Sequence, residues 1–289
     1  PIGLATYALL RDGKRCLPGV VAGVVASLLL AHQTLPFALL HGAGQILAPW
    51  AGAQILNRFV ERPAHLLERT DAALKLLTVA YAAAVPSACA TVAGMAVAGL
   101  VPAGQWLDTG SVLWLGDALG IIVTILPLLA WTSGRAPKLT AGRLIEQTVV
   151  IVALLGVLAA TFFGVRLLAD PVLQLYAALP LVVWGALRFP PRIGWSVFLV
   201  SSLVALAGTA HGTSPLGQYP MNVQIVVLHG LITLSAATAL FIGAAMHEKQ
   251  MARRALRESE SHFRALTLLS ADWHWELDAN LHYFRLPDD

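Results

Sequence analysis

The sequence has little charge for its length. Only 12% of its 289 residues are Lys, Arg, Asp or Glu, whereas 57% are hydrophobic, and its mean hydropathy is +0.70. Soluble domains usually carry about 25% charged residues. This shortage excludes a water-soluble protein, because there is too little charge to hydrate the surface of a chain of this size.

Cysteine and the common catalytic motifs are also scarce. The two cysteines, Cys16 and Cys89, cannot form a disulfide framework or a cysteine-based metal site. The sequence contains no P-loop, glycine-rich dinucleotide turn, nucleophile elbow or zinc motif. We therefore expect no catalytic residues, no metal and no cofactor in this segment. The net charge of +3 comes from basic residues in short loops, so we expect no nucleic-acid partner.

The charge that is present is distributed unevenly. Residues 1–246 hold 21 of the 35 Lys, Arg, Asp and Glu residues, and the much shorter stretch 247–289 holds 14. Such a break indicates two solvents, lipid and water. It predicts a transmembrane domain over 1–246, a cytoplasmic linker helix over 247–270 and the start of a truncated soluble domain over 271–289.

Long apolar runs fill the first part of the chain. A membrane-spanning helix needs about 20 mostly apolar residues. The runs predict an all-α polytopic membrane bundle of about nine segments, the first one partial: 1–10, 17–33, 36–57, 73–100, 111–132, 144–164, 171–187, 194–209 and 223–246.

The loops between these segments alternate in charge. Lys and Arg occur near 11–15, 58–72, 133–143 and 188–192 and again in the tail, but not near 31–35, 101–110 or 210–222, with Arg166 as the exception. Because basic loops stay on the cytoplasmic side of a membrane, the pattern places the C-terminus in the cytoplasm.

The tail predicts a helix followed by strands. Residues 247–270 lack Gly and Pro and should continue the last membrane helix. The apolar seam of the heptad through Leu256 and Phe263 is broken by polar residues, and we expect a homodimer through this helix. Trp273, Trp275 and Leu277 alternate with polar residues as on a half-buried strand, a turn follows at 278–280, and a second strand should start near His282.

Asp117 is the main candidate for function. A carboxylate within an apolar run costs about 2.5–3.5 kcal/mol on insertion scales unless it is paired, protonated or hydrated. Trp114, Asp117 and Thr124 share one helical face, and Gly116 and Gly120 form a small-residue stripe beside it. One interpretation is a ligand-binding or signal-sensing site. The other is a shallow Asp117 that forms only local hydrogen bonds.

Other polar residues in apolar runs have structural interpretations. Interhelical hydrogen bonds account for His41, Gln45, Gln54, Gln147 and His229 when each is considered alone. Trp184 and Arg188, four residues apart at a cytoplasmic helix end, are expected to anchor that end, with the guanidinium stacked on the indole. Pro49, Pro86, Pro127 and Pro180 should kink their helices.

Four stretches resemble a known family in their order along the chain. They are PIGLATYALLRDGKRCLPGV at the start, WLGDALGIIVTILPLLAW at 114–131, LPLVVWGALRFPPRIG after it, and ESHFRALTLLSADWHWELD in the tail. The first three resemble the type-one membrane-associated sensor (MASE) domain of bacterial signalling proteins. The last resembles the entry to a PAS domain, an α+β fold. The family usually has a further helix before Pro1.

The resemblance implies an integral membrane sensory input module of the bacterial inner membrane. Such modules regulate a diguanylate cyclase, phosphodiesterase or histidine kinase domain, which this chain does not contain. The expected partners are the lipid bilayer, a second copy bound through the cytoplasmic helix, and signalling proteins. Two alternatives remain: a secondary transporter, or a scaffold that only anchors a cytoplasmic enzyme and its partners.

Overall fold

The computed structural model describes residues 2–31, 34–59, 63–132, 141–162, 173, 176–270, 276–277, 280 and 283–285. The chain divides into two compact units, Pro1–Ala245 and Met246–Asp289. The assignment of these parts to a transmembrane sensor, a signalling helix and a PAS domain stays a prediction.

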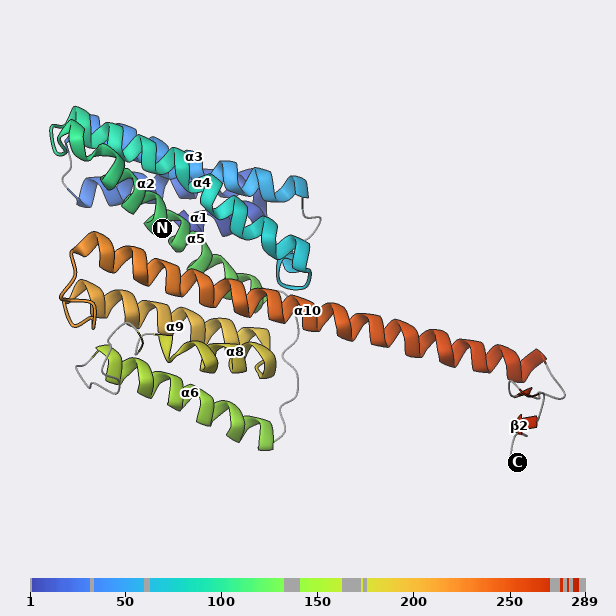
Figure 1. The fold of residues 1–289 in the computed structure, drawn as a ribbon. Helices are drawn as coiled ribbons and strands as arrows, with labels where there is room; N and C mark the ends of the chain where they lie inside the picture. Colours follow the sequence, from blue (N-terminus) through green and yellow to red (C-terminus); the bar gives the residue numbers. More distant parts are fainter. Residues whose placement is uncertain are drawn as a thin grey trace. The chain divides into compact units, whose positions relative to one another are not determined.

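The described part of the first unit is almost entirely helical (Figure 1). Short 3-10 turns occur at Gly13–Cys16, Pro63–Leu67 and Ala103–Gln105. The helices are α1 (Ile2–Asp12), α2 (Leu17–Leu30), α3 (Leu35–Phe59), α4 (Thr70–Val97), α5 (Trp106–Thr132), α6 (Ala141–Phe162), α8 (Leu179–Arg188), α9 (Pro191–Ala210) and α10 (Met221–Ser270).

Six helical stretches of the described residues are long and apolar enough to cross a membrane, by length and composition: Ile2–Leu30, Thr70–Val97, Ala103–Thr132, Leu144–Phe162, Pro191–Ala210 and Met221–Leu266. Helices occur in all of the predicted segments, but the count of nine spans is not confirmed. The first two segments form one stretch, α3 is interrupted by polar side chains, and α8 has only 10 residues. Ten residues extend about 15 Å, half the thickness of a bilayer core. Residues 171, 172, 174 and 175 lie outside the described residues.

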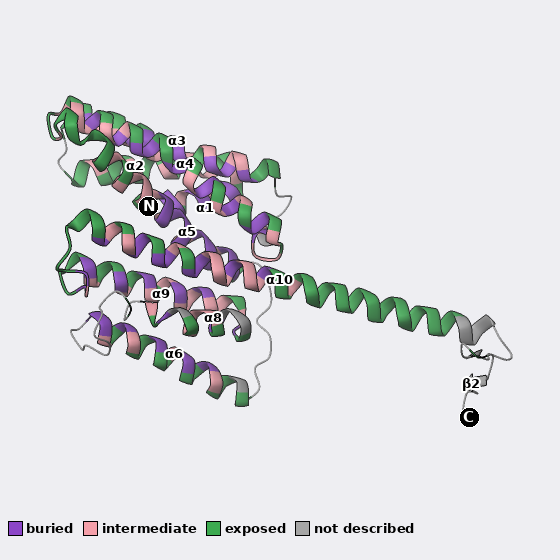
Figure 2. Ribbon diagram, viewed as in Figure 1, coloured by how far each residue is buried: buried purple, intermediate pink, exposed green. Residues whose placement is uncertain are grey.

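Helix α5 is central to the packing of the first unit. It contacts α1, α4 and α9, while α3 packs on α4 and α1, and α6 packs on α8 and α9. Ile122, Ile125, Leu126 and Leu129 of α5 are completely or almost completely buried. Figure 2 shows buried residues in the second half of α5, whereas its first half is exposed or intermediate. The core therefore follows the second half of α5.

Small residues allow the closest helix contacts. A Cβ added at Gly44 of α3 would lie 2.8 Å from the Cβ of Ala90 and 3.1 Å from the backbone of Ser87 on α4. A Cβ at Gly3 of α1 would collide with the Gly120 carbonyl of α5. Close backbone approach of this kind is typical of helix interfaces in lipid. Gly19, by contrast, has open space around it.

The second unit contains the end of α10 and a short hairpin. Strand β1 (Glu276–Leu277) pairs antiparallel with β2 (Tyr283–Arg285), with Leu277 opposite Tyr283. The strands predicted at Leu277 and just after His282 are therefore present, whereas Trp273 and Trp275 lie outside the described residues. A two-stranded hairpin does not identify a PAS domain, which stays a prediction.

The contact between α3 and α4 gives a stability prediction. Gly44→Ala should lower the free energy of unfolding by about 1–3 kcal/mol, because the added methyl group overpacks the interface. The matched control is Gly19→Ala, which meets nothing and should be neutral or slightly stabilising. Thermal unfolding of the purified variants in lipid would measure both, and equal midpoints would contradict the packing described here.

Candidate functional site

Five polar side chains from three helices meet within the membrane bundle, and we call them the polar cluster: His41 and Gln45 of α3, Ser87 and Thr91 of α4, and Asp117 of α5. Gln45 Nε2 donates to Ser87 Oγ at 3.0 Å, and His41 Nδ1 lies 2.9 Å from Thr91 Oγ1. The Asp117 carboxylate interacts electrostatically with His41, and it makes none of the side-chain hydrogen bonds of the described residues. The cluster thus joins α3, α4 and α5.

Asp117 is not at a helix end. It lies eleven residues after Trp106, the first residue of α5, which corresponds to about 16 Å along the helix axis. It is half-buried, and it is in none of the ion pairs of the described residues. A carboxylate in such a place needs neutralisation or strong hydrogen bonds to offset its desolvation.

The protonated nitrogen of His41 follows from its partner. The Thr91 hydroxyl donates its hydrogen to the Ser87 carbonyl at 2.8 Å, so its oxygen can only accept from the imidazole. His41 Nδ1 therefore carries a hydrogen. Phe37, one turn earlier on α3, stacks on the ring with centroids 5.2 Å apart, which fixes the ring plane.

Prolines adjoin the polar cluster on two helices. Pro49 of α3 lacks the N–H that would pair with the Gln45 carbonyl, four residues earlier. Pro86 of α4 directly precedes Ser87 and likewise leaves the Ala82 carbonyl without its usual partner. This part of the bundle therefore contains backbone carbonyls that lack their usual helical hydrogen bond, in addition to the polar side chains.

A second polar contact, which we call the junction, connects the bundle with α10. The Tyr81 hydroxyl of α4 lies 2.7 Å from His229 Nε2 and 3.3 Å from Thr233 Oγ1, both on α10. Trp114 of α5 donates from Nε1 to the Tyr81 carbonyl at 2.8 Å and packs edge-on against its ring. His229 is 6% exposed, and its ring also lies near the Leu115 carbonyl. Three helices are thus held together at Tyr81.

The structure separates the residues predicted to form one site. Asp117 belongs to the polar cluster and Trp114 to the junction, one helical turn away on α5. Gly120 and Thr124 instead face α1, where they meet Ile2 and Gly3, while Gly116 is exposed with open space beside it. A signal-sensing role for these residues stays a prediction.

Tyr81, Ser87, Thr91 and Thr233 were not predicted from the sequence. A usable signal was present, because three polar pairs occur at i, i+4 spacing on otherwise apolar helices: His41 with Gln45, Ser87 with Thr91, and His229 with Thr233. Residues at this spacing share a helix face. These pairs were not recognised because each polar residue was considered separately.

Arg188 and Trp184, predicted to anchor a helix end, share one hydrogen-bond partner. Arg188 donates from Nε and Nη2 to the two carboxylate oxygens of Glu146 on α6, at 2.7 and 3.0 Å. Trp184 Nε1 donates to the same carboxylate at 3.1 Å. The pair therefore ties α8 to the beginning of α6, and Glu146 could not be paired with it from the sequence because it is 38 residues from Trp184.

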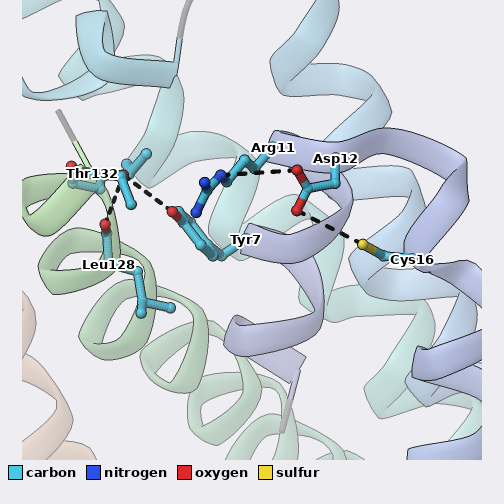
Figure 3. A network of polar contacts seen from close by, with 7 residues as sticks. Tyr7, Arg11, Asp12, Cys16, Leu128 and Thr132 are labelled. Atoms are coloured by element: carbon cyan, nitrogen blue, oxygen red, sulfur yellow. Dashed lines mark hydrogen bonds and ion pairs between the residues drawn. The ribbon is translucent and has the colours of Figure 1, made fainter.

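A further polar network lies at the ends of α1 and α5 (Figure 3). The Tyr7 hydroxyl donates to Thr132 at 3.1 Å, and the nearby Asp12 carboxylate contacts Arg11 and Cys16 at 3.8 and 3.9 Å. Arg11, Asp12 and Thr132 are exposed, so this network resembles a helix-end anchor more than a ligand site. In the described part of the chain no three His, Cys, Asp or Glu side chains gather as they would around a metal ion.

The junction gives a second stability prediction. Tyr81→Phe removes the hydroxyl that contacts α10 and should lower the free energy of unfolding by about 1 kcal/mol, since interhelical hydrogen bonds in membranes contribute on that scale. Tyr219→Phe, at an exposed tyrosine, is the matched control and should have no effect. Unfolding midpoints of the two variants in lipid would test this, and equal losses would refute a specific role for Tyr81.

Comparison with known proteins identifies the family. Residues 1–250 match the family model MASE1, which covers every residue of the polar cluster and of the junction. No curated protein and no solved structure gives a match. MASE1 is a membrane-associated sensor domain, sensory rather than catalytic, and the apolar helices make this a multi-pass membrane protein. The chain therefore belongs to the MASE1 family of membrane-associated sensor domains.

Proposed function

We propose that the chain is the sensory input module of a bacterial inner-membrane signalling protein, with its C-terminus in the cytoplasm. It transmits a membrane or periplasmic signal to a cytoplasmic output domain, which is a diguanylate cyclase, phosphodiesterase or histidine kinase. MASE1 membership supports the sensory part of this proposal, and the alternation of basic and non-basic loops supports the orientation.

The observation that carries the proposal is the length of α10. This helix runs from Met221 to Ser270. His229 and Leu240 are buried in the bundle, whereas residues 248–266 of the same helix are exposed. A helix transmits axial shifts and rotations along its length, so a change among the buried residues would reach the exposed ones.

The two polar contacts suggest how a signal would enter α10. Asp117 and Trp114 are one turn apart on α5, and Trp114 is bonded to Tyr81, which contacts His229. A stimulus that binds at the polar cluster would shift the equilibrium between two arrangements of the bundle. The size of this free-energy shift is limited by the difference between the stimulus's binding free energies for the two arrangements. The junction would pass the new arrangement to α10.

A second copy is the partner that best fits the exposed part of α10. Leu256, Phe263 and Leu266 are all more than half exposed there. Pairing of two such helices would bury this apolar surface, and a rotation could then change the spacing of two output domains. Homodimerisation is part of the proposal on this ground.

A secondary transporter is the second candidate, and the polar cluster is the observation that favours it. Polar groups beside proline-interrupted helices near mid-membrane are typical of transport sites. The exposed half of α10 favours the sensor, because transport does not need it. Substrate uptake into proteoliposomes would support the transporter.

Reporter fusions test the orientation. Alkaline phosphatase fused after Asp289 should be inactive and green fluorescent protein there fluorescent, because only the first needs export. Phosphatase fused within 101–110 or 210–222, the loops without Lys or Arg, should be active. Phosphatase activity at Asp289 would reverse the proposed topology.

Insertions in α10 test transmission in the full-length protein. One alanine inserted after Glu258 rotates the following residues by about 100° and should change the output activity several-fold. Seven inserted residues leave a rotation of only about 20° and should restore it. Cellular product levels of the output enzyme would be the measurement.

If both insertions leave the output unchanged, α10 passes no rotation. Replacing 1–246 with an unrelated membrane anchor would then separate the remaining alternatives. Normal regulated output from the replacement would indicate a scaffold, whereas lost regulation would require another transmission route.

A further inference from the structure

We propose that the end of α5 and the beginning of α9 form a docking site for an anionic phospholipid of the bilayer. The lipid phosphate binds Arg192, and one acyl chain lies along the outer face of α9. This site is separate from the polar cluster and from the junction. It goes beyond the sensory function and does not depend on it, because lipid binding can be measured without any output domain.

The headgroup end of the site is a cation held over an aromatic ring. The guanidinium carbon of Arg192 lies 5.7 Å from the centroid of the Trp131 ring. Trp131 Nε1 donates to Ser196 Oγ at 2.8 Å, and Ser196 is one turn after Arg192 on α9. The indole of α5 is therefore bonded to the same helix that supplies the cation above it. Because ring and guanidinium are held in place before binding, little conformational entropy is lost when a ligand arrives.

Both residues lie at the ends of candidate membrane spans. Trp131 is the last residue but one of α5, and Arg192 is the second residue of α9. Tryptophan is enriched at the level of the lipid headgroups, and basic side chains there attract anionic lipids. The Trp131 side chain is 58% exposed, so that a lipid can reach the ring from outside the bundle.

The donors of Arg192 are available to an external anion. In the part of the chain that the structure describes, Arg192 takes part in no hydrogen bond and in no ion pair, and its one printed contact is the Trp131 ring. Arg188, four residues earlier, instead donates twice to the carboxylate of Glu146. A stacked guanidinium keeps its edge open, and this edge binds phosphate through two parallel N–H···O bonds. Of these two arginines, Arg192 is therefore the one suited to a phosphate.

The face of α9 that begins with Arg192 continues as an exposed apolar surface. At about 100° per residue, Leu203 and Leu206 lie about 20° and 40° to either side of Arg192 around the helix axis. Both are exposed, as is Val200 between them and Arg192 along the chain. Leu203 is about 16 Å from Arg192 along the axis, which is about half the thickness of a bilayer core. The apolar surface thus has the length of one acyl chain below the headgroup.

This combination fits a lipid better than a soluble anion. Inorganic phosphate or an acidic peptide could use Arg192 but would gain nothing from Leu203. A zwitterionic lipid carries its own cation beside the phosphate, whereas an anionic lipid brings the negative charge that complements Arg192. Charge and apolar surface, in this order along α9, therefore select an anionic phospholipid.

Thermal unfolding of the whole chain in lipid nanodiscs tests the proposal. Phosphatidylglycerol would replace phosphatidylcholine in steps at constant ionic strength, and unfolding would be followed by circular dichroism. Binding to the folded state should raise the midpoint by a few degrees and level off as the phosphatidylglycerol fraction increases. Inorganic phosphate added to phosphatidylcholine nanodiscs should have no such effect. An equal rise with inorganic phosphate would overturn the lipid as the ligand.

Variants locate the effect at Arg192. Arg192→Gln should raise the phosphatidylglycerol fraction needed for half of the shift about five-fold, the effect expected of one arginine at an anionic surface. Arg58→Gln is the matched control and should change this fraction less than two-fold, because Arg58 is an exposed arginine near the end of α3 without a printed ring contact.

Two further variants keep the charge or remove only the ring. Arg192→Lys preserves the positive charge but loses the planar fork, and Trp131→Leu preserves every charge but loses the ring. Each should raise the half-shift fraction about two- to three-fold, and both keep the proposal testable if Arg192→Gln does not fold.

A loss confined to the Arg192 and Trp131 variants would support the site. Equal midpoints in the two lipids would overturn the proposal. A lipid effect that is the same in the wild-type chain, in Arg192→Gln and in Trp131→Leu would also overturn it, since general surface charge would then account for the effect. Equal losses in Arg192→Gln and Arg58→Gln would lead to the same conclusion.

Discussion

The absence of water from the bilayer core is the constraint on which this structure depends. A backbone or side-chain polar group there costs several kcal/mol unless it finds a partner within the protein. Helices satisfy the backbone. Some polar side chains, such as Thr6 and Ser202, donate to a carbonyl of their own helix, whereas several polar side chains of different helices meet at the polar cluster and at the junction. Their positions therefore decide which helices can be neighbours, since apolar packing alone discriminates weakly between helices surrounded by lipid.

Helix α5 combines these requirements. Its buried apolar face forms much of the core, its Gly120 admits α1, and its Trp114 and Asp117 supply one member to each polar contact. Because both residues lie on one helix, a displacement of α5 at one contact also moves the residue that forms the other contact. This arrangement gives a physical reason for a sensor domain to concentrate its polar residues on a central helix.

Hydropathy was sufficient to place the helices, because the length of an apolar run is a local property of the chain. The continuation of α10 past residue 246 also followed from local sequence, as did the interest in Asp117. The partners of these residues did not follow, since Tyr81 and His229 are 148 residues apart. Gly116 was assigned to the same site as Asp117 because of its spacing along the helix. The open space beside Gly116 depends instead on how the other helices pack, which the local sequence does not specify. Arg188 and Trp184 were paired with each other because Glu146 lies on another helix.

The Tyr81 hydroxyl has one hydrogen and lies between two acceptors, His229 Nε2 and Thr233 Oγ1. In one arrangement it donates to the imidazole, which then carries its own hydrogen on Nδ1. In the other, Nε2 donates to the tyrosine oxygen, the hydroxyl turns to Thr233, and Nδ1 is left as a bare lone pair. Nδ1 is buried and makes no hydrogen bond among the described residues. The two tautomers therefore differ in the polarity that the imidazole presents to the nearby Leu115 carbonyl, although the helices occupy the same positions in both.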